Sequence, residues 1–389
     1  MRIGIYVAHV GVLPGYERMV SGHVQIPLYS ARLLRDAGHE VELISTRMTG
    51  RCLPDCLPRD LPLHEVIDAS RQGTASEHDV GRRGGFHPLR LVQWLRQVRA
   101  LARRYDVMHF FGANRTVSLA GLIRSLPGAC PTLVTFNVGV FPEPYLALTR
   151  PFWKRIDRVL TSTDYFHRKL TAAGIQSHVL RHGVVKDLRM SDVRRRHRVL
   201  FWREATPRNG GDIAAEVFRR LAPRYPNVHF DLAVRPHWSE VDGLETLAKT
   251  YPNVGLHRAP YPAGFSFEAL MAEAICVLLP FRAYTVQPQL SILESLAAGV
   301  PVVASNIEST AELIQSGSNG LVIPAGDADA ATRAVEELIR DPARAQTMGQ
   351  AAASFVKQEW NWSSYVDELQ SHYTAVLSAR NLKPRITTG

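Results

Sequence analysis

Short apolar β runs alternate with amphipathic helical patterns along almost the whole chain, and this alternation restricts the possible folds more than any other feature. In the first half, we predict strands at RIGIYVAH, EVELIST, DVMHFFG, PTLVTFN and RVLTST, and helices at HVQIPLYSARLLRDAGH and from Asp164 to Gly174. Strands that alternate with helices at this spacing are typical of parallel α/β units. The first half of the chain is therefore predicted to form a Rossmann-like domain.

A charge-rich segment, DLRMSDVRRRHR, interrupts this pattern at residues 187–198. The alternation then starts again at Val199, with the strands VLFWRE, VHFDLAV, CVLLPF, VPVVAS and GLVIPA. A chain of 389 residues is also longer than one ordinary core supports. We predict an α/β protein with Rossmann-like domains at residues 1–190 and 191–365, and a final helix within residues 366–389 that returns to the first domain.

The balance of residue types favours a soluble globular protein, with 46% hydrophobic and 21% charged residues. The opening MRIGIYVAHVGV alternates like a strand, and no apolar run reaches the roughly 18 residues that a membrane span needs. We expect a cytoplasmic protein. A net charge of +10 allows an anionic partner such as a nucleotide, a nucleic acid or a lipid surface. Nucleic acid is not expected, because the basic residues are dispersed and no binding motif is recognised.

Four cysteines are too few for a disulfide framework in a chain of this length. Cys52 and Cys56 have a spacing compatible with half a zinc site, but no second Cys/His pair follows at a suitable distance. We interpret the cysteines as ordinary reduced thiols and predict no metal site.

A single carboxylate, Glu294, stands in the Ala/Leu-rich helical stretch of QPQLSILESLAAGVPVVAS. A solvated helix would carry several charges on its outer face, whereas this one has only Glu294 between Gln289 and Gly299. The pattern favours a carboxylate that binds a ligand. The alternative is a buried glutamate whose partners lie within the protein, or one that interacts with the helix dipole.

Several sequence blocks occur in the order found in one enzyme group. SGHVQIPLYSARLLRDAGHEVELIS, DVMH, TFN and RHGV lie in the first half, and FWREATPRNGGD, SILESLAAGVPVVAS and SGSNGLVIPAGDADA in the second. This succession resembles the GT-B glycosyltransferases, in particular the retaining family 4 group (glycosyl transferases group 1). The resemblance implies two Rossmann-like domains that face each other across an interdomain cleft. It also implies an acceptor-binding first domain and a nucleotide-sugar-binding second domain.

Charge at the pyrophosphate of a nucleoside diphosphate sugar increases as the sugar departs, so donors aimed there stabilise the transition state. Arg203 and Arg208 lie in the block that resembles the family's phosphate segment, where two guanidinium groups could bind phosphate oxygens. Asn209 and Gly210 would allow a close backbone approach. The alternative is two solvated arginines.

The helix that carries Glu294 begins near Gln289 or Leu290, so the free N–H groups of its first turn could receive the pyrophosphate. Leu290 and Ser291 are the donor-binding candidates in this turn. Glu294, one turn further on, could accept hydrogen bonds from both ribose hydroxyls. From the other domain, Gly22 resembles the second glycine of the family's Gly-Gly loop, which would bring backbone amides toward the phosphates. A simple turn before a helix is the alternative for Gly22.

Two positions depart from the family's pattern. The family usually has a second Glu eight residues before Glu294, and this sequence has Val286 there. Thr285 and Gln287 are neutral candidates for that sugar-binding role. Asn137 stands where the family commonly has His, and it could hydrogen-bond sugar or acceptor but could not transfer a proton. A plain strand-end asparagine is the alternative.

The segment from Arg90 to Tyr105 forms an amphipathic pattern whose polar side carries several arginines. Its apolar face is formed by Leu91, Trp94, Leu95, Val98, Leu101, Ala102 and Tyr105. Such a helix could lie on an anionic membrane, as in lipid-glycosylating members of the group. The alternative is a domain helix with a solvated basic face.

These features together predict transfer of a glycosyl group from a nucleoside diphosphate sugar to a hydroxyl acceptor, with retention implied by the resemblance. In a front-face reaction the leaving phosphate oxygen helps to deprotonate the acceptor, so no protein nucleophile and no cofactor are expected. The acceptor could be lipid-linked, a saccharide or a secondary-metabolite scaffold. The alternatives are a sugar-nucleotide epimerase on the same fold and a non-catalytic sugar-nucleotide-binding protein.

Overall fold

The computed structural model describes residues 1–12, 14, 22–47, 51–69, 87–136, 143–185, 197–235, 239–262, 264–283 and 286–382. The chain divides into two compact units. Unit 1 contains Met1–Gly183 and Trp362–Gly389, and unit 2 contains Val184–Asn361. The first boundary between the units thus follows Gly183, and the second precedes Trp362. The sequence analysis placed these boundaries after residue 190 and before residue 366.

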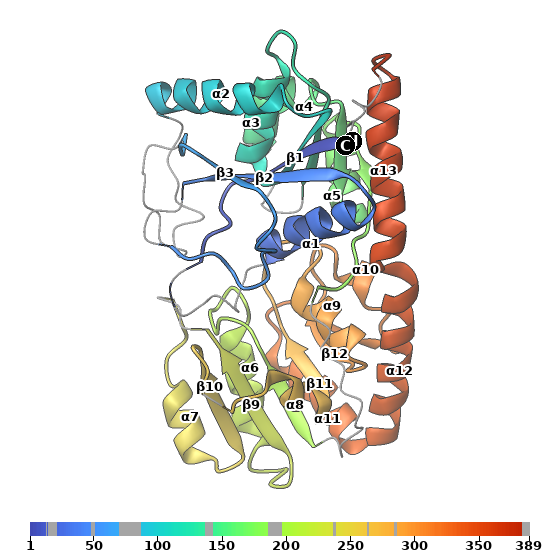
Figure 1. Ribbon diagram of the computed structural model, residues 1–389. Coiled ribbons are helices and arrows are strands. Elements are labelled where there is room, and N and C mark those ends of the chain that lie inside the picture. Colours follow the sequence, from blue (N-terminus) through green and yellow to red (C-terminus); the bar gives the residue numbers. More distant parts are fainter. Residues whose placement is uncertain are drawn as a thin grey trace. The chain divides into compact units, whose positions relative to one another are not determined.

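Unit 1 is built on a seven-stranded parallel sheet with the order β3-β2-β1-β4-β5-β6-β7. Its strands β1, β2 and β3 are labelled in Figure 1. Its strands are β1 (Arg2–Val7), β2 (Glu40–Thr46), β3 (Leu63–Val66), β4 (Val107–Gly112), β5 (Thr132–Phe136), β6 (Arg158–Thr161) and β7 (His178–Val179). Its helices are α1 (Gly22–Asp36), α2 (Pro88–Ala102), α3 (Asn114–Arg124), α4 (Glu143–Trp153), α5 (Asp164–Ala172) and α13 (Trp362–Ser378).

Unit 2 repeats this design with a six-stranded parallel sheet of order β10-β9-β8-β11-β12-β13. Its strands are β8 (Arg198–Phe201), β9 (His229–Val234), β10 (Val254–Arg258), β11 (Ala274–Leu279), β12 (Val302–Ser305) and β13 (Gly320–Ile323). Its helices are α6 (Gly211–Leu221), α7 (Leu244–Thr250), α8 (Phe267–Ala272), α9 (Leu290–Ala297), α10 (Thr310–Leu313), α11 (Ala328–Arg340) and α12 (Pro342–Glu359).

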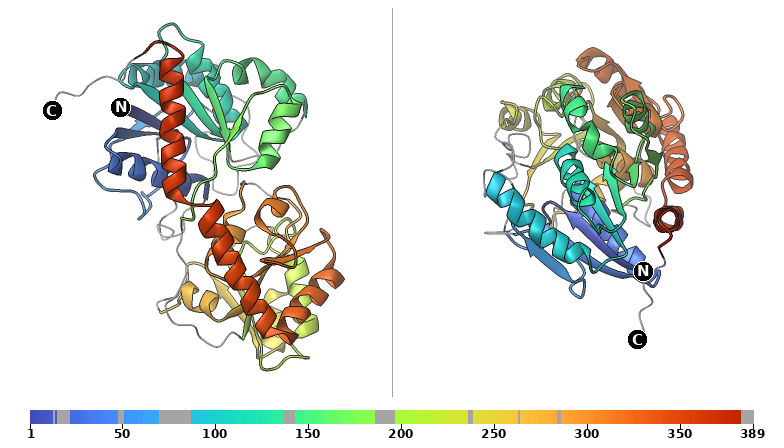
Figure 2. Two further views of the ribbon diagram at one scale, coloured as in Figure 1. Left: turned by 90° about the vertical axis from the view of Figure 1, so that its right-hand side faces the viewer. Right: turned by 90° about the horizontal axis from the view of Figure 1, so that it is seen from above.

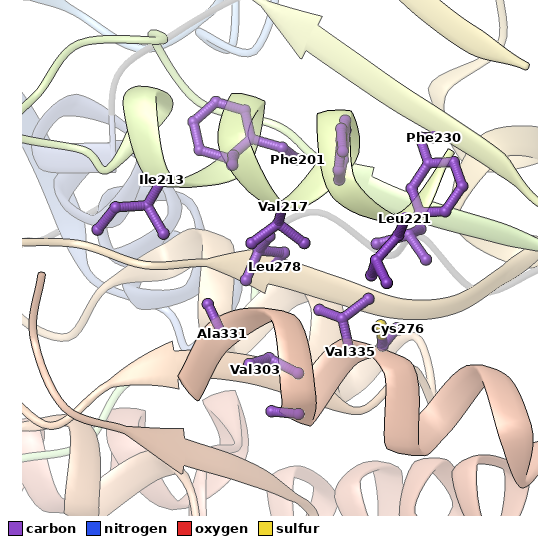
Figure 3. Close-up of a cluster of buried hydrophobic side chains, with 14 of the residues drawn as sticks. Phe201, Ile213, Val217, Leu221, Phe230, Cys276, Leu278, Val303, Ala331 and Val335 are labelled. Atoms are coloured by element: carbon purple, nitrogen blue, oxygen red, sulfur yellow. The ribbon is translucent and has the colours of Figure 1, made fainter. Parts of the chain in front are cut away.

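The core of unit 2 lies between its sheet and the adjacent helices α6 and α11. In Figure 3, side chains from α6 face side chains from β11, β12 and α11. The labelled members are Phe201, Ile213, Val217, Leu221, Phe230, Cys276, Leu278, Val303, Ala331 and Val335. Because the strands are covered on both faces, their sequences are continuous apolar runs rather than alternating ones.

The final helix α13 belongs to unit 1 (Figure 2). Polar side-chain contacts hold it there. The Tyr373 hydroxyl lies 2.8 Å from Nδ1 of His109 in β4, and the Tyr365 hydroxyl lies 3.0 Å from the Ser30 hydroxyl in α1. At the first residue of α13, the Trp362 ring leaves no room for a Cβ atom on Gly183. The two points where the chain crosses between units therefore touch within unit 1.

Helix α2 is an integral part of unit 1. Trp94, Val98 and Ala102 are buried, and the other residues of the predicted apolar face pack against the same core. That face is therefore covered by protein. Among the described residues, no helix is both long and apolar enough to cross a membrane.

Candidate functional site

The order of the strands in unit 2 reverses between β8 and β11. The first strand in sequence, β8, has β9 on one side and β11 on the other, so the connections on its two sides run in opposite directions. In open parallel sheets, ligands bind outside the carboxyl ends of the strands at such a point. The segment after β8 and the segment between β11 and α9 are thus the places to look for a site in unit 2.

Arg203 lies just beyond β8, and its side chain is 23% exposed. Its Nε is buried and makes no hydrogen bond to any described residue, and its Nη2 lies 3.4 Å from Oε2 of Glu204. Burial lowers the pKa of Arg203, while the negative charges of Glu204 and Glu294 oppose that shift. An arginine stays protonated at neutral pH even so. Arg203 is therefore a half-buried cation with an unused donor.

The turn after Arg203 is fixed by close backbone packing. Gly210 has a φ of 76° in the left-handed region, and a Cβ atom there would collide with the carbonyl of Pro280. Asn209 donates from Nδ2 to the carbonyl oxygen of Glu204 at 3.0 Å. Arg208 is exposed, and its carbonyl accepts a hydrogen bond from the Arg282 backbone at 2.8 Å. The close backbone approach that Gly210 permits is thus between its own backbone and the backbone of Pro280.

Helix α9 carries the carboxylate that the sequence singled out. Glu294 is only 4% exposed, and Leu290 and Ser291 at the start of the helix are also buried. The Ser291 hydroxyl makes no hydrogen bond to any described residue. The first N–H groups of a helix have no partner inside it. The start of α9 therefore offers backbone donors and a buried hydroxyl beside the end of β8.

Trp202 connects α9 to the end of β8. Its indole Nε1 donates to the Ser295 hydroxyl at 3.1 Å, and Ser295 donates to the carbonyl oxygen of Ser291 at 2.6 Å. The Trp202 ring also packs against Phe267, with ring centres 4.7 Å apart. These contacts hold Arg203 and α9 at the same edge of the sheet.

The side chain of Gln287 is occupied by neighbours from the loop after β12. Gln287 is 1% exposed; its Nε2 donates to Glu308, and its Oε1 accepts from the Ser309 hydroxyl. Val286 beside it is half-buried. Thr285 lies outside the described residues.

Two candidate residues from the first domain belong to unit 1. Gly22 is the first residue of α1. Asn137, which follows β5, lies outside the described residues.

Two residues that the sequence analysis did not single out, Arg235 and Glu204, also lie at this edge. Arg235 follows β9, and its Nη2 lies 2.7 Å from Oε1 of Glu204. Asn209 Nδ2 donates to the other carboxylate oxygen of Glu204 at 3.2 Å. The position of Arg235 at the carboxyl end of a predicted strand was the available signal. Its partner lies too far away in the sequence for a local pattern to reveal the pair.

In chemical terms, this edge of unit 2 can bind an anion and a polar diol. Arg203 supplies a cation with a free donor, the start of α9 supplies N–H groups, and Glu294 supplies acceptor oxygens. Among the described residues, no group of three or more His, Cys, Asp or Glu side chains could hold a metal ion.

Two family models match the chain in sequence. The model described as Glycosyl transferase 4-like domain matches residues 21–182, and the model described as Glycosyl transferases group 1 matches residues 196–341. The phosphatidyl-myo-inositol mannosyltransferase of Mycolicibacterium smegmatis is 24% identical over 93% of this chain and 91% of its own length.

A second mannosyltransferase of the same organism matches a shorter region. This GDP-mannose-dependent alpha-(1-6)-phosphatidylinositol monomannoside mannosyltransferase is 28% identical over 40% of this chain. The match spans only 42% of that relative's length.

Solved structures with a similar fold cover almost the whole chain. Sucrose-phosphate synthase from Thermosynechococcus elongatus has a TM-score of 0.72 at 16% identity, covering 97% of this chain and 99% of its own. Anabaena HepE, solved in complex with UDP, has a TM-score of 0.71 at 15% identity, covering 96% of this chain and 100% of its own. At these identities the likeness concerns the fold.

Proposed function

The chain belongs to the glycosyl transferases group 1 family and has the predicted GT-B fold, and we propose that it transfers a glycosyl group from a nucleoside diphosphate sugar to a hydroxyl acceptor. One observation carries the proposal. Arg203, the start of α9 and Glu294 are brought together at the carboxyl edge of unit 2, where the strand order reverses. Arg203 and the N–H groups of α9 bind the pyrophosphate, and Glu294 binds the ribose diol.

GDP-mannose is the first donor to test. The monomannoside mannosyltransferase that matches this chain is GDP-mannose-dependent by name. Val286 leaves the donor sugar without the carboxylate that the family usually supplies, and Gln287 is bound to Glu308 and Ser309. The sugar is therefore held chiefly through groups other than these two.

The proposed reaction retains the anomeric configuration. The departing phosphate oxygen accepts the proton of the acceptor hydroxyl on the same face of the sugar, and Arg203 stabilises the charge that develops on the phosphate. No protein nucleophile, metal or cofactor takes part in this scheme. In this scheme Asn137 hydrogen-bonds the sugar or the acceptor and transfers no proton.

For the acceptor, we propose a lipid-linked molecule reached by peripheral contact with an anionic membrane. The related mannosyltransferases act on phosphatidylinositol derivatives by name. The outer face of α2 exposes Leu89 and Val92 together with Arg96 and Arg103. Arginines attract anionic headgroups, and two exposed apolar side chains can enter the interface.

A non-catalytic sugar-nucleotide-binding protein is the second candidate. Val286 and the occupied side chain of Gln287 favour it, because both reduce the contacts available to a donor sugar. Such a protein would keep the phosphate and ribose contacts of the proposed site.

Donor screening followed by product analysis tests the proposal. Calorimetry with GDP-mannose, UDP-glucose, GDP and UDP should identify a ligand, and incubation with phosphatidylinositol vesicles should yield a glycolipid with retained configuration. Binding without transfer or hydrolysis would favour the second candidate. Isomerised donor in the absence of acceptor would indicate an epimerase, and failure to bind any of the four ligands would overturn the proposed site.

A further inference from the structure

The carboxylate of Glu204 lies among three side chains that could otherwise donate to a ligand. Arg235 Nη2 lies 2.7 Å from its Oε1, while Asn209 Nδ2 at 3.2 Å and Arg203 Nη2 at 3.4 Å lie near its Oε2. The Glu204 carboxylate thus interacts with the same donors that could bind an anionic ligand.

The sheet places this cluster at the proposed phosphate site. Arg203 and Glu204 follow β8, Arg235 follows β9, and β8 and β9 are parallel neighbours. The side chains of Arg203, Glu204 and Arg235 are 23%, 19% and 27% exposed, respectively. Water screens half-buried charges incompletely, so a ligand at Arg203 would interact with the charge of Glu204 as well.

The reaction changes the charge of the ligand at this site. A nucleoside diphosphate sugar carries two negative charges on its pyrophosphate. A free nucleoside diphosphate ends in a phosphate monoester whose second pKa is near 6, so at neutral pH it carries about one charge more. A fixed carboxylate beside the same arginine therefore weakens binding of the free nucleotide by about 3- to 10-fold more than binding of the sugar nucleotide.

We propose that Glu204 is a charge-selecting residue of the phosphate site, which disfavours the free nucleoside diphosphate relative to its sugar derivative. The proposal rests on the proposed function, since it takes a nucleotide phosphate as the ligand of Arg203. Glu204 keeps Arg203 and Arg235 close together and opposes retention of the product. Its effect is on the ratio of two affinities, which a purely structural glutamate would not change.

The test compares two pairs of ligands by calorimetry: GDP with GDP-mannose, and UDP with UDP-glucose. In Glu204→Gln, which keeps the shape and removes the charge, the free nucleotide should gain about 3- to 10-fold more affinity than the sugar nucleotide. Inhibition by added nucleoside diphosphate should increase accordingly. Glu204→Asp keeps the charge and should keep the affinity ratio of the wild type.

Glu273→Gln is the matched control. Glu273 is 15% exposed and pairs with Arg198, where β8 and β11 begin, so its replacement changes the net charge equally at the opposite edge of the same sheet. This variant should keep the wild-type ratio. Thermal melting checks that each variant folds, and Glu204→Ala replaces Glu204→Gln if the latter does not.

The outcomes separate this proposal from the proposed function. An unchanged ratio of the two affinities in Glu204→Gln would overturn the proposal. If both affinities fall equally, Glu204 only positions Arg203 and Arg235. If neither the wild type nor any variant binds any of the four ligands, the assignment of the phosphate site is wrong. If the ratio shifts but no transfer occurs, charge selection stands and the enzymatic function does not.

Discussion

Two charged residues, Arg203 and Glu294, carry most of the proposed chemistry at the scale of single side chains. Glu294 is 4% exposed in a helix that is buried over most of its length. Its negative charge interacts with Arg203 and opposes the lowering of the pKa of that guanidinium group by burial. Burial of an ionised carboxylate costs several kcal/mol unless hydrogen bonds and opposite charges compensate. A ligand diol would supply two such hydrogen bonds, which makes Glu294 the most informative residue to change.

Glu294→Gln should weaken binding of a nucleoside diphosphate by about 10- to 100-fold, because a hydrogen bond to a charged group contributes about 1.5–3 kcal/mol. The 2′,3′-dideoxy analogue lacks both hydroxyls, so the same change should hardly affect its affinity. Calorimetry of wild type and variant with both ligands measures the difference. Equal losses for the two ligands would mean that Glu294 is structural.

Arg203→Ala should also weaken nucleoside diphosphate binding by about 10- to 100-fold, since Arg203 is half-buried and its charge-assisted bonds are poorly screened. The effect of Arg208→Ala should be smaller because Arg208 is exposed. Arg340→Ala, which removes a side chain that is 64% exposed on α11, controls for net charge. Similar affinities of the Arg203 variant and this control would exclude Arg203 from the site.

Among the secondary-structure elements, α2 shows how one helix can serve both the core and the surface. Its apolar side is buried in unit 1, so a membrane contact would have to use the opposite side. There Leu89 is 72% exposed and Val92 is 46% exposed, with Arg96 and Arg103 also exposed along the helix. The expected contact is therefore mainly electrostatic, with shallow apolar insertion at the start of the helix.

Reversal of both exposed arginines, in Arg96→Glu/Arg103→Glu, should reduce binding to anionic phospholipid vesicles at least tenfold. Each basic residue near such a surface contributes about 1 kcal/mol. Sedimentation at low salt measures binding, which should fall as added salt screens the charges. The matched pair Arg333→Glu/Arg344→Glu, on α11 and α12, should bind like wild type. Absence of wild-type binding at low salt would refute the membrane contact.

At the scale of the whole molecule, buried polar groups hold the last helix, α13, on the rest of unit 1. His109 bonds to Tyr373 of α13 and to Thr135 of β5, both at 2.8 Å. Burial lowers the pKa of His109 to about 3 and that of His182 to about 4. Both imidazoles are fully buried, so unit 1 is folded around neutral histidines.

Acidification should therefore destabilise unit 1. Below about pH 6.5 the unfolded chain protonates both imidazoles, whereas folded His182 stays neutral to about pH 4 and His109 to about pH 3. The unfolded state then binds more protons, so the free energy of unfolding falls as the pH decreases through this window. At pH 5 the loss is about 2 kcal/mol for each histidine.

Amide hydrogen exchange at pH 7 and pH 5, corrected for the intrinsic exchange rate, measures this effect in β4 and α13. His109→Gln should lessen the loss of protection. His229→Gln, which changes a histidine of unit 2, serves as the control. Protection that stays constant between the two pH values would contradict the prediction.

The sequence alone determined the local design of this protein. The alternation of apolar runs and amphipathic segments predicts the α/β fold, and the predicted helix from Asp164 to Gly174 corresponds to α5 at Asp164–Ala172. The pattern of Arg90 to Tyr105 predicts the buried face of α2. These features follow from short apolar runs in the strands and a period of 3.6 residues in the helices, which depend only on neighbouring positions.

Tertiary structure alone decided how the polar side chains are used. Gln287 is a candidate sugar ligand in the sequence, but its amide is bound by Glu308 and Ser309, 21 and 22 positions away. Glu204 acquires Arg235 as a partner because β8 and β9 are neighbours in the sheet. A hydrogen bond depends on distance and direction in space, and strand pairing joins segments that are far apart in the chain. No local period of the sequence records those distances.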